Sequence, residues 1–309
     1  MTARNRKRLC PRSAEWYWWE DFCFSPAHLY IAYERGESLM ACYHFHAEII
    51  SRGRGKSAVA VSAYISGEKL RDIYEGRIHD RSYRQDVVHT EIMLPPKAPD
   101  ELLDRQTLLN ELNRAEKRND AQMARYIDLA LPKELSLSEQ VALVREFVQV
   151  NFIRYGLCAD IGIHQGELDE DRKPTGIEPV FERSDNRHAH IMIPLRPLDE
   201  YGFCLTKHQT RFMNYPSFLI ALRESWANLQ NREFERRRLS VRVSHESLAA
   251  QGIDREPTKH LGPGAMALEL RGIQTERGDM YREIIERNRM REERKQRHRN
   301  RNRDWIRSR

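Results

Sequence analysis

Three histidines in the second half of the chain have the spacing and the neighbours of metal ligands. His188 and His190 are two residues apart, and the apolar run after them is typical of a strand that enters a core. Because residues i and i+2 of a strand point to the same face, both imidazoles project from one side. Neutral imidazoles are common ligands of divalent metals. His164 ends another strand-like segment, residues 159–164, which could supply a third ligand from a neighbouring strand.

The His-x-His pair alone leaves an alternative open, because two solvated histidines on a half-exposed strand give the same pattern. Three imidazoles would leave positions on a metal for a phosphoryl oxygen, which the metal would polarise and hold for attack. Zinc-dependent hydrolysis is a rival use, but the chain lacks the His-Glu-x-x-His helix motif of metalloproteases. Phosphoryl chemistry then requires a nucleophile.

Tyr64 is the candidate nucleophile. It follows a basic, glycine-containing loop, residues 51–57. Small residues precede it in the sequence: Ser57, Ala58, Ala60, Ser62 and Ala63. They leave room for another chain to reach the ring, where attack on a phosphodiester would give a phosphotyrosine that keeps the energy of the cleaved linkage. A phenol has a pKa of about 10, so the bound phosphate and nearby cations must help it to ionise. Tyr64 is one of 12 tyrosines, and a structural role is the alternative.

Composition indicates a soluble, cytoplasmic protein. Of the 309 residues, 40% are hydrophobic and 32% are charged, which fits one large domain with extensions. No run approaches the roughly 20 apolar residues of a membrane span, so no membrane insertion is expected. The N-terminus lacks the pattern of a secretory signal. The five cysteines are scattered and form no Cys-x-x-Cys pair, which argues against a disulfide framework or a zinc–thiolate site.

The net charge of +6 belongs to the C-terminal tail rather than to the whole chain. Residues 289–309 hold ten Arg or Lys against three acidic residues, so the rest of the chain sums to −1. The tail could grip DNA electrostatically, or it could be a solvated arm with no partner. The overall charge therefore does not by itself predict nucleic-acid binding.

The pattern along the chain divides it into three parts. Residues 1–39 hold three of the five tryptophans without clear periodicity. We expect an N-terminal extension there, disordered or upstream of the natural start at Met40; an aromatic segment that packs on the domain is the alternative. Residues 40–272 form the predicted domain, and residues 273–309 form a charged tail that is helical and then disordered.

Within the domain, strand-like and helix-like segments alternate unevenly. Strands are expected near residues 42–50, 87–94, 124–131, 159–164, 188–193 and 241–243, and helices near 58–70, 99–118, 136–147 and 215–234. The two histidine strands could pair across the loop between them. We predict an α+β fold, an antiparallel sheet with helices packed mainly on one face.

Several separate motifs, in order, resemble the MobA/MobL relaxases, including the TraA-type conjugation proteins. The resemblance runs from Met40 to about Gly272 and is carried by the segments 40–45, 51–53, 57–64, 129–135, 186–192 and 251–262. It implies a palm-like relaxase fold of the His-hydrophobic-His endonuclease superfamily. Such enzymes nick one DNA strand at an origin of transfer (oriT), stay joined to its 5′ end through tyrosine, and later reseal it.

Carried over by position, the resemblance makes Tyr64 the nucleophile and His164, His188 and His190 the ligands of Mg²⁺ or Mn²⁺. Asp128 falls where the family has an acidic residue, and it could orient a ligating histidine. A surface aspartate is the alternative for Asp128, with Glu134 as the second choice.

The expected partners are single-stranded or supercoiled DNA at oriT, a type IV coupling protein and accessory relaxosome proteins. Three features depart from the family: a longer loop between residues 164 and 188, Arg187 in place of proline, and Ser244 in place of an aspartate. No primase or helicase module follows, so a relaxase domain alone is expected. A rolling-circle replication initiator of the same superfamily, or a DNA-binding relic that no longer cleaves, are the alternative functions.

Overall fold

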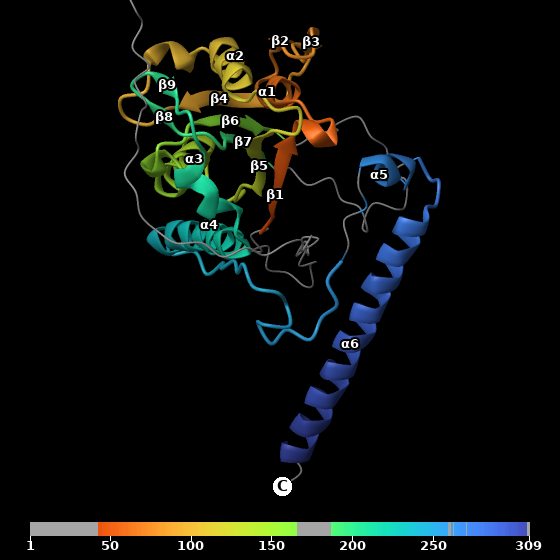
Figure 1. The fold of residues 1–309 in the computed structure, drawn as a ribbon. Helices are drawn as coiled ribbons and strands as arrows, with labels where there is room; N and C mark the ends of the chain where they lie inside the picture. The colour runs from red at the N-terminus through yellow and green to blue at the C-terminus, as the bar shows by residue number, and fades with distance from the viewer. Residues whose placement is uncertain (1–42, 166–186, 259–260, 262, 270, 308–309) are drawn as a thin grey trace, which may run out of the picture.

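An antiparallel sheet of five strands forms the centre of the molecule (Figure 1). This computed structural model describes residues 43–165, 187–258, 261, 263–269 and 271–307. The strand order is β1-β5-β7-β6-β4, and every neighbouring pair is antiparallel. The strands are β1 (Phe45–Ser51), β5 (Gln122–Ala130), β7 (His188–Pro194), β6 (Ala159–His164) and β4 (Val87–Met93). The predicted α+β class with an antiparallel sheet is confirmed.

Two long helices cover one face of the sheet. They are α3 (Leu137–Asn151) and α4 (Pro216–Arg236), which lie together in the view of Figure 1. Phe147 of α3 and Trp226 of α4 are fully buried and meet edge to face, with ring centroids 5.4 Å apart. A capping box of Ser136 and Glu139 is present at the start of α3, where the sequence predicted a helix from residue 136. This face is the larger apolar core.

Two shorter helices pack on the opposite face. They are α1 (Ala58–Ser66) and α2 (Arg105–Ala115), which share a second core with Ile50 of β1 and Met192 of β7. The prediction that helices pack mainly on one face holds for the two longest helices on the sheet, α3 and α4. The shorter helices α1 and α2 cover the other face. Strand alternation explains the division, since each central strand buries side chains toward both helix pairs.

A hairpin of β2 (Lys69–Asp72) and β3 (Arg77–Asp80) follows α1 and was not expected from the sequence. We predicted a helix through Leu70, but α1 ends at Ser66, because Gly67 has φ of 69° and caps the helix in the left-handed conformation. A second short hairpin joins β8 (Leu198–Asp199) and β9 (Gly202–Phe203). The described part of the domain also holds four 3-10 turns: Arg52–Arg54, Asp100–Leu103, Ile153–Tyr155 and His208–Asn214.

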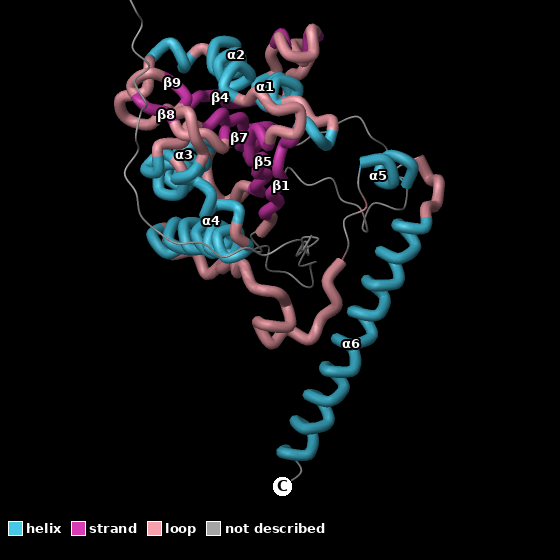
Figure 2. Tube along the Cα trace, in the orientation of Figure 1, coloured by secondary structure: helices cyan, strands magenta, loops and turns pink. Residues whose placement is uncertain are grey.

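The chain after α4 has irregular backbone and then two helices. The strand predicted at residues 241–243 is wrong, because Asn231 of α4 bonds both the backbone N–H and the carbonyl of Val243 and takes the place of a strand partner. The last helices are α5 (Pro263–Glu269) and α6 (Glu276–Arg307). Figure 2 shows α6 as one long helix that extends away from the sheet.

Two sequence predictions remain, which concern the N-terminal extension and the absence of a membrane-spanning helix. The N-terminal extension, residues 1–39, lies outside the described residues. Among the described helices, none combines the length and the apolar composition needed to cross a membrane.

Candidate active site

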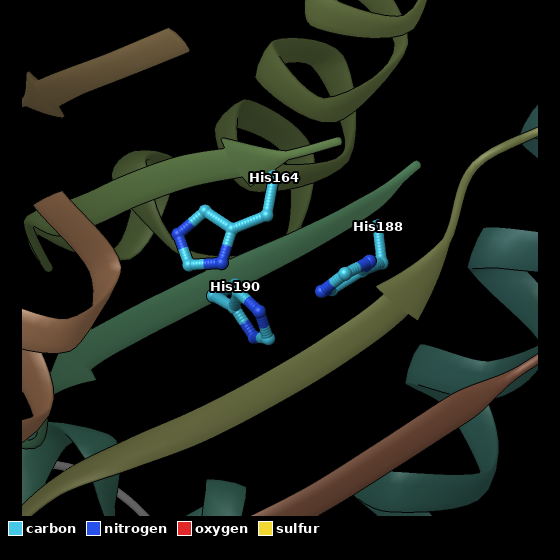
Figure 3. Close-up of side chains that lie close together, drawn as sticks. All are labelled: His164, His188 and His190. Carbon is cyan, nitrogen blue, oxygen red and sulfur yellow. The ribbon is translucent and has the colours of Figure 1, made fainter. Parts of the chain in front are cut away.

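The three predicted metal ligands meet on the sheet face that carries α1. His164 ends β6 and pairs directly with His188 at the start of β7, and His190 pairs with Gly162. The ring centroids of His164 and His190 are 4.4 Å apart, and those of His188 and His190 are 4.7 Å apart. One ring nitrogen from each histidine lies within 4.8 Å of the other two. Figure 3 shows the three rings converging on one space from two neighbouring strands.

His190 has one satisfied and one unsatisfied ring nitrogen. Its Nδ1 lies 2.5 Å from the hydroxyl of Tyr126, and the two rings are nearly parallel at 17°. Its Nε2 is buried and has no hydrogen-bond partner among the residues that the structure describes. Burial of an unpaired ring nitrogen is unfavourable unless a ligand takes it up. This orphaned atom, directed by the bond at Nδ1, fits a metal ligand.

His164 is oriented by the end of α1. Its fully buried ring places Nε2 2.9 Å from the backbone carbonyl of Ile65, to which it can donate. Nδ1 is then the nitrogen whose lone pair can accept a proton or a metal. In Figure 3 this nitrogen is on the side of the ring that faces His188 and His190. The site can therefore offer three imidazole nitrogens to one divalent cation.

Tyr64 is brought to the histidines by the same helix. Its ring centroid lies 5.2 Å from that of His190 and 5.4 Å from that of His164, both in edge contacts. The side chain is 36% exposed, so the ring touches the histidine cluster while part of it remains accessible. The structure thus brings together the predicted nucleophile and two of the predicted ligands, which are about 100 residues or more apart in sequence.

Gly162 and a buried polar network fix α1 against β6. A Cβ on Gly162 would lie only 2.2 Å from the carbonyl oxygen of Ile65, so only glycine permits this approach. One turn earlier, the Ser62 hydroxyl donates to the fully buried Asp160, which also accepts from Arg105 of α2 at 3.0 Å. These contacts hold the helix that carries Tyr64 at a fixed distance from the histidines.

Arg84 is a cation of the site that the sequence analysis did not identify. It lies in the segment before β4, with its guanidinium carbon 4.1 Å from the centroid of the Tyr64 ring. Its Nη2 is 3.2 Å from Nδ1 of His164, and it forms a two-point ion pair with Asp86. The guanidinium therefore contacts the predicted nucleophile and a predicted ligand at once.

Asp128 lies beside the cluster on β5, directly paired with His190. Its Oδ1 is 3.9 Å from Nδ1 of His190, and its Oδ2 is 3.6 Å from Nε2 of His44. Tyr126, rather than Asp128, is in direct hydrogen-bond contact with His190. Glu134, the second choice, lies in the turn between β5 and α3, where its carboxylate oxygens have no hydrogen-bond partner among the described residues.

Burial decides the ionisation of His164 and His190, whereas neighbouring imidazoles decide that of Asp128. Burial lowers the pKa of His164 to about 4, with further lowering by the Arg84 cation, and it lowers the pKa of His190 to about 3. Burial also acts to raise the pKa of Asp128, but His44 and the other neighbouring imidazoles oppose it and lower that pKa to about 2. At neutral pH these two imidazoles are uncharged, as metal ligands must be, beside an ionised carboxylate.

Two further residues of the site had a signal in the sequence. Tyr126 stands two residues before Asp128, and Gly162 stands two residues before His164, so strand alternation puts each on the same face as its predicted neighbour. Arg84 had no such signal, because it precedes its strand and reaches the site only through the tertiary fold.

Residues 56–271 match the MobA/MobL family. The chain belongs to this family. MobA/MobL proteins are relaxase and mobilisation proteins, and similar proteins of the family include the mobilization protein MobL of Acidithiobacillus ferridurans. The MobL protein is 31% identical over 265 residues, which span 80% of this chain and 69% of MobL. The conjugal transfer protein TraA of Agrobacterium fabrum (strain C58) is also 31% identical over 76% of this chain, but the match spans only 22% of TraA.

The fold of this MobA/MobL chain also matches a solved structure described as "Molecular Basis of Vancomycin Resistance Transfer in Staphylococcus aureus". The TM-score is 0.56 at 31% sequence identity, and the match covers 68% of this chain and all of the other. The predicted family, fold and mobilisation class are therefore confirmed.

Proposed function

We propose that this MobA/MobL protein nicks one strand of DNA at an origin of transfer and joins itself to the 5′ end through Tyr64. The contact of the partly exposed Tyr64 ring with His164 and His190, beside the unpartnered Nε2 of His190, carries the proposal. It puts a candidate nucleophile at the edge of a three-imidazole cluster. Membership of the family already indicates a role in mobilisation, and the proposal adds the chemical step, which is the nicking of one strand and attachment to its 5′ end.

The reaction is a transesterification in which atoms and charge balance. The Tyr64 hydroxyl oxygen attacks the scissile phosphorus, the bond to the 3′ oxygen breaks, and the phenolic proton ends on the released 3′ hydroxyl. Because a phosphodiester is exchanged for a phosphodiester, the reverse attack by a 3′ hydroxyl reseals the strand. The Arg84 guanidinium, 4.1 Å from the Tyr64 ring centroid, can stabilise negative charge that develops on the phenol oxygen.

His164, His188 and His190 would hold the divalent cation, which would polarise the scissile phosphate when bound. The role of Tyr126 and Asp128 is to keep His190 oriented and electron-rich. Mg²⁺ or Mn²⁺ is the proposed ion; Mg²⁺ prefers oxygen ligands, so a site of three nitrogens should bind Mn²⁺ more tightly. The proposed partners remain oriT DNA, a type IV coupling protein and accessory relaxosome proteins.

A nicking assay tests the proposal. The protein is incubated with a supercoiled plasmid that carries the DNA upstream of its own gene, with Mg²⁺ or Mn²⁺, and with chelator in a parallel reaction. We expect a nick at one position of one strand and a covalent protein–DNA adduct. Both products should be lost in Tyr64→Phe and after chelation.

Matched variants assign the roles. Tyr201→Phe removes the hydroxyl of another exposed tyrosine, in the turn between β8 and β9, and should leave the adduct unchanged. His188→Ala should weaken Mn²⁺ binding in calorimetry. An adduct that survives Tyr64→Phe would show that another residue is the nucleophile, and a protein that binds oriT DNA without nicking it would be the non-cleaving relic.

A further inference from the structure

Arg84 stands where a metal bound to His164 would have to enter. Nη2 of Arg84 is 3.2 Å from Nδ1 of His164, which is hydrogen-bond distance to the nitrogen that faces the other imidazoles. The second ring nitrogen, Nε2, is already engaged with the Ile65 carbonyl at 2.9 Å. The hydrogen bond from Arg84 therefore uses the one lone pair that His164 can offer to a metal.

Coordination and this hydrogen bond exclude each other. A divalent metal on an imidazole nitrogen lies about 2.1 Å from it, along the direction of the lone pair. A guanidinium nitrogen at 3.2 Å on that side of Nδ1 would meet both the ion's volume and its like charge. Arg84 is also well covered, with a side-chain exposure of 15%, so solvent screens this repulsion only partly.

We propose that the Arg84 guanidinium and the divalent cation compete for Nδ1 of His164, so that metal binding displaces Arg84 toward Tyr64. The inference rests on the proposed function, because it takes the three histidines as the metal site. Asp86 is the pivot for this movement. It binds Arg84 at two points, its Oδ2 lies 4.0 Å from Nδ1 of His164, and its backbone carbonyl accepts from Gln165.

The displaced guanidinium stays in the site. It already covers the Tyr64 ring at 4.1 Å, and the ion pair with Asp86 limits how far it can withdraw. The same cation would therefore remain beside the Tyr64 ring after it leaves His164. Arg84 thus lowers metal affinity while it supplies positive charge next to the nucleophile. A variant that lacks Arg84 should therefore bind the metal more tightly but form less adduct.

Calorimetric titration with Mn²⁺ measures the competition directly. In Arg84→Gln we expect Mn²⁺ to bind about tenfold more tightly than in the wild type, since a like charge at close range is gone. Adduct formation should fall in the same variant. Arg84→Lys keeps the charge and should bind Mn²⁺ nearly as the wild type does. Unchanged or weaker binding by Arg84→Gln would overturn the proposal.

A second cycle separates competition from a gained ligand. Loss of Arg84 frees the Asp86 carboxylate, which could itself bind the metal. Arg84→Gln should therefore also raise the affinity when it is introduced into Asp86→Asn. A gain that appears only with Asp86 intact would mean that the carboxylate is a new ligand, and competition would be refuted.

Arg145→Gln is the matched control for net charge. Arg145 of α3 pairs with Glu91 of β4, as Arg84 pairs with Asp86, but Arg145 is half exposed and lies on the helix that covers the opposite face of the sheet from His164, His188 and His190. Its loss should change the Mn²⁺ affinity less than about twofold, and an equal gain there would refute a local effect. Wild-type binding that survives His190→Ala would refute the metal site itself. Binding that requires His190 but ignores Arg84 would refute the competition alone.

Discussion

The two faces of the central sheet differ in what they bury, although the same strands supply both. In β7, Ala189 and Ile191 point into the apolar core under α3 and α4, while His188 and His190 point toward α1. Both kinds of residue are largely buried. Burial of apolar side chains stabilises the fold, whereas burial of a polar atom without a partner destabilises it.

Stability and chemistry therefore depend on alternate residues of the same strand. The face toward α3 and α4 contributes the larger part of the apolar burial that holds the domain together. The face toward α1 buries groups such as the unpartnered Nε2 of His190, which do not stabilise the fold and are kept for another reason. A substitution on one face should therefore affect the free energy of unfolding, and its neighbour on the other face should affect metal binding and the adduct.

The largest effect that separates the faces is expected from Gly162→Ala. The new Cβ would lie 2.2 Å from the Ile65 carbonyl oxygen, so the end of α1 must move by about an ångström. A displacement of that size lowers rates about 10²-fold in other enzymes. We expect the rate of adduct formation to fall by about that factor, measured with an oriT oligonucleotide.

The control for Gly162→Ala makes the same change where there is space. A Cβ on Gly264 of α5 meets no atom within 4 Å, so Gly264→Ala should leave the rate unchanged. A Gly162→Ala protein with wild-type rate would mean that the distance between Tyr64 and the histidines is not critical.

Ile191→Ala tests the apolar face next to a ligand. Ile191 is fully buried, pairs with Ile127 and Ile161, and is adjacent to His190 in sequence. Its truncation should lower the free energy of unfolding by about 2–5 kcal/mol, measured by urea denaturation. The folded variant should bind Mn²⁺ with wild-type affinity, whereas His190→Ala should lose the metal with little change in stability. A loss of metal binding in both would show that the faces are not independent.

The sequence predicted the residues whose signal is local. Alternation along a strand put His188 and His190 on one face, and the strand-like segment 159–164 offered His164 as a third ligand. The basic loop and the small residues before Tyr64 marked it as the candidate nucleophile, and the resemblance to the family gave each residue its role. The antiparallel sheet was also predictable, because the two histidine strands are consecutive strand-like segments. The start of α3 was a local signal of the same kind, since the helix predicted from residue 136 begins with the capping box of Ser136 and Glu139.

Contacts that depend on tertiary register could not be predicted. Arg84 reaches His164 only because β4 lies beside β6, and no periodic pattern marks a residue that precedes a strand. The need for glycine at position 162 arises from the crossing of α1, almost a hundred residues earlier in the chain. Hydrophobic periodicity indicates which face a residue occupies, but it does not indicate which helix packs there.

Acid should destabilise the polar face selectively. The pKa values of His164 and His190 fall from 6.5 to about 4 and about 3 on folding, so below pH 6.5 the unfolded state binds more protons. Stability is therefore complete above pH 6.5 and is lost as the pH falls toward the folded values. At pH 5 the loss is about 2 kcal/mol per histidine. Urea denaturation with chelator present should show this loss of stability. The His190→Gln variant should lose less stability at pH 5 than the wild type does, and an equal loss in both proteins would mean that other groups cause it.

The smallest effect is expected at a second cluster with the spacing of metal ligands. Asp72, Glu75 and His79 of the β2–β3 hairpin also bring three ligand atoms within 4.8 Å. The Asp72 carboxylate, however, already accepts the Ser57 hydroxyl at 2.6 Å and two backbone N–H groups of the turn after β2.

A carboxylate used in this way caps the turn and the start of α1, and a metal would have to break those bonds. His79→Ala should therefore leave Mn²⁺ binding with one site and change its affinity less than about twofold in calorimetry, while His190→Ala abolishes it. A second Mn²⁺ site that disappears in His79→Ala would show that hydrogen-bonded carboxylates in this fold still take up metal. The unpaired Nε2 of His190 would then not distinguish the two clusters, and the assignment of the metal would rest on contact with Tyr64 alone.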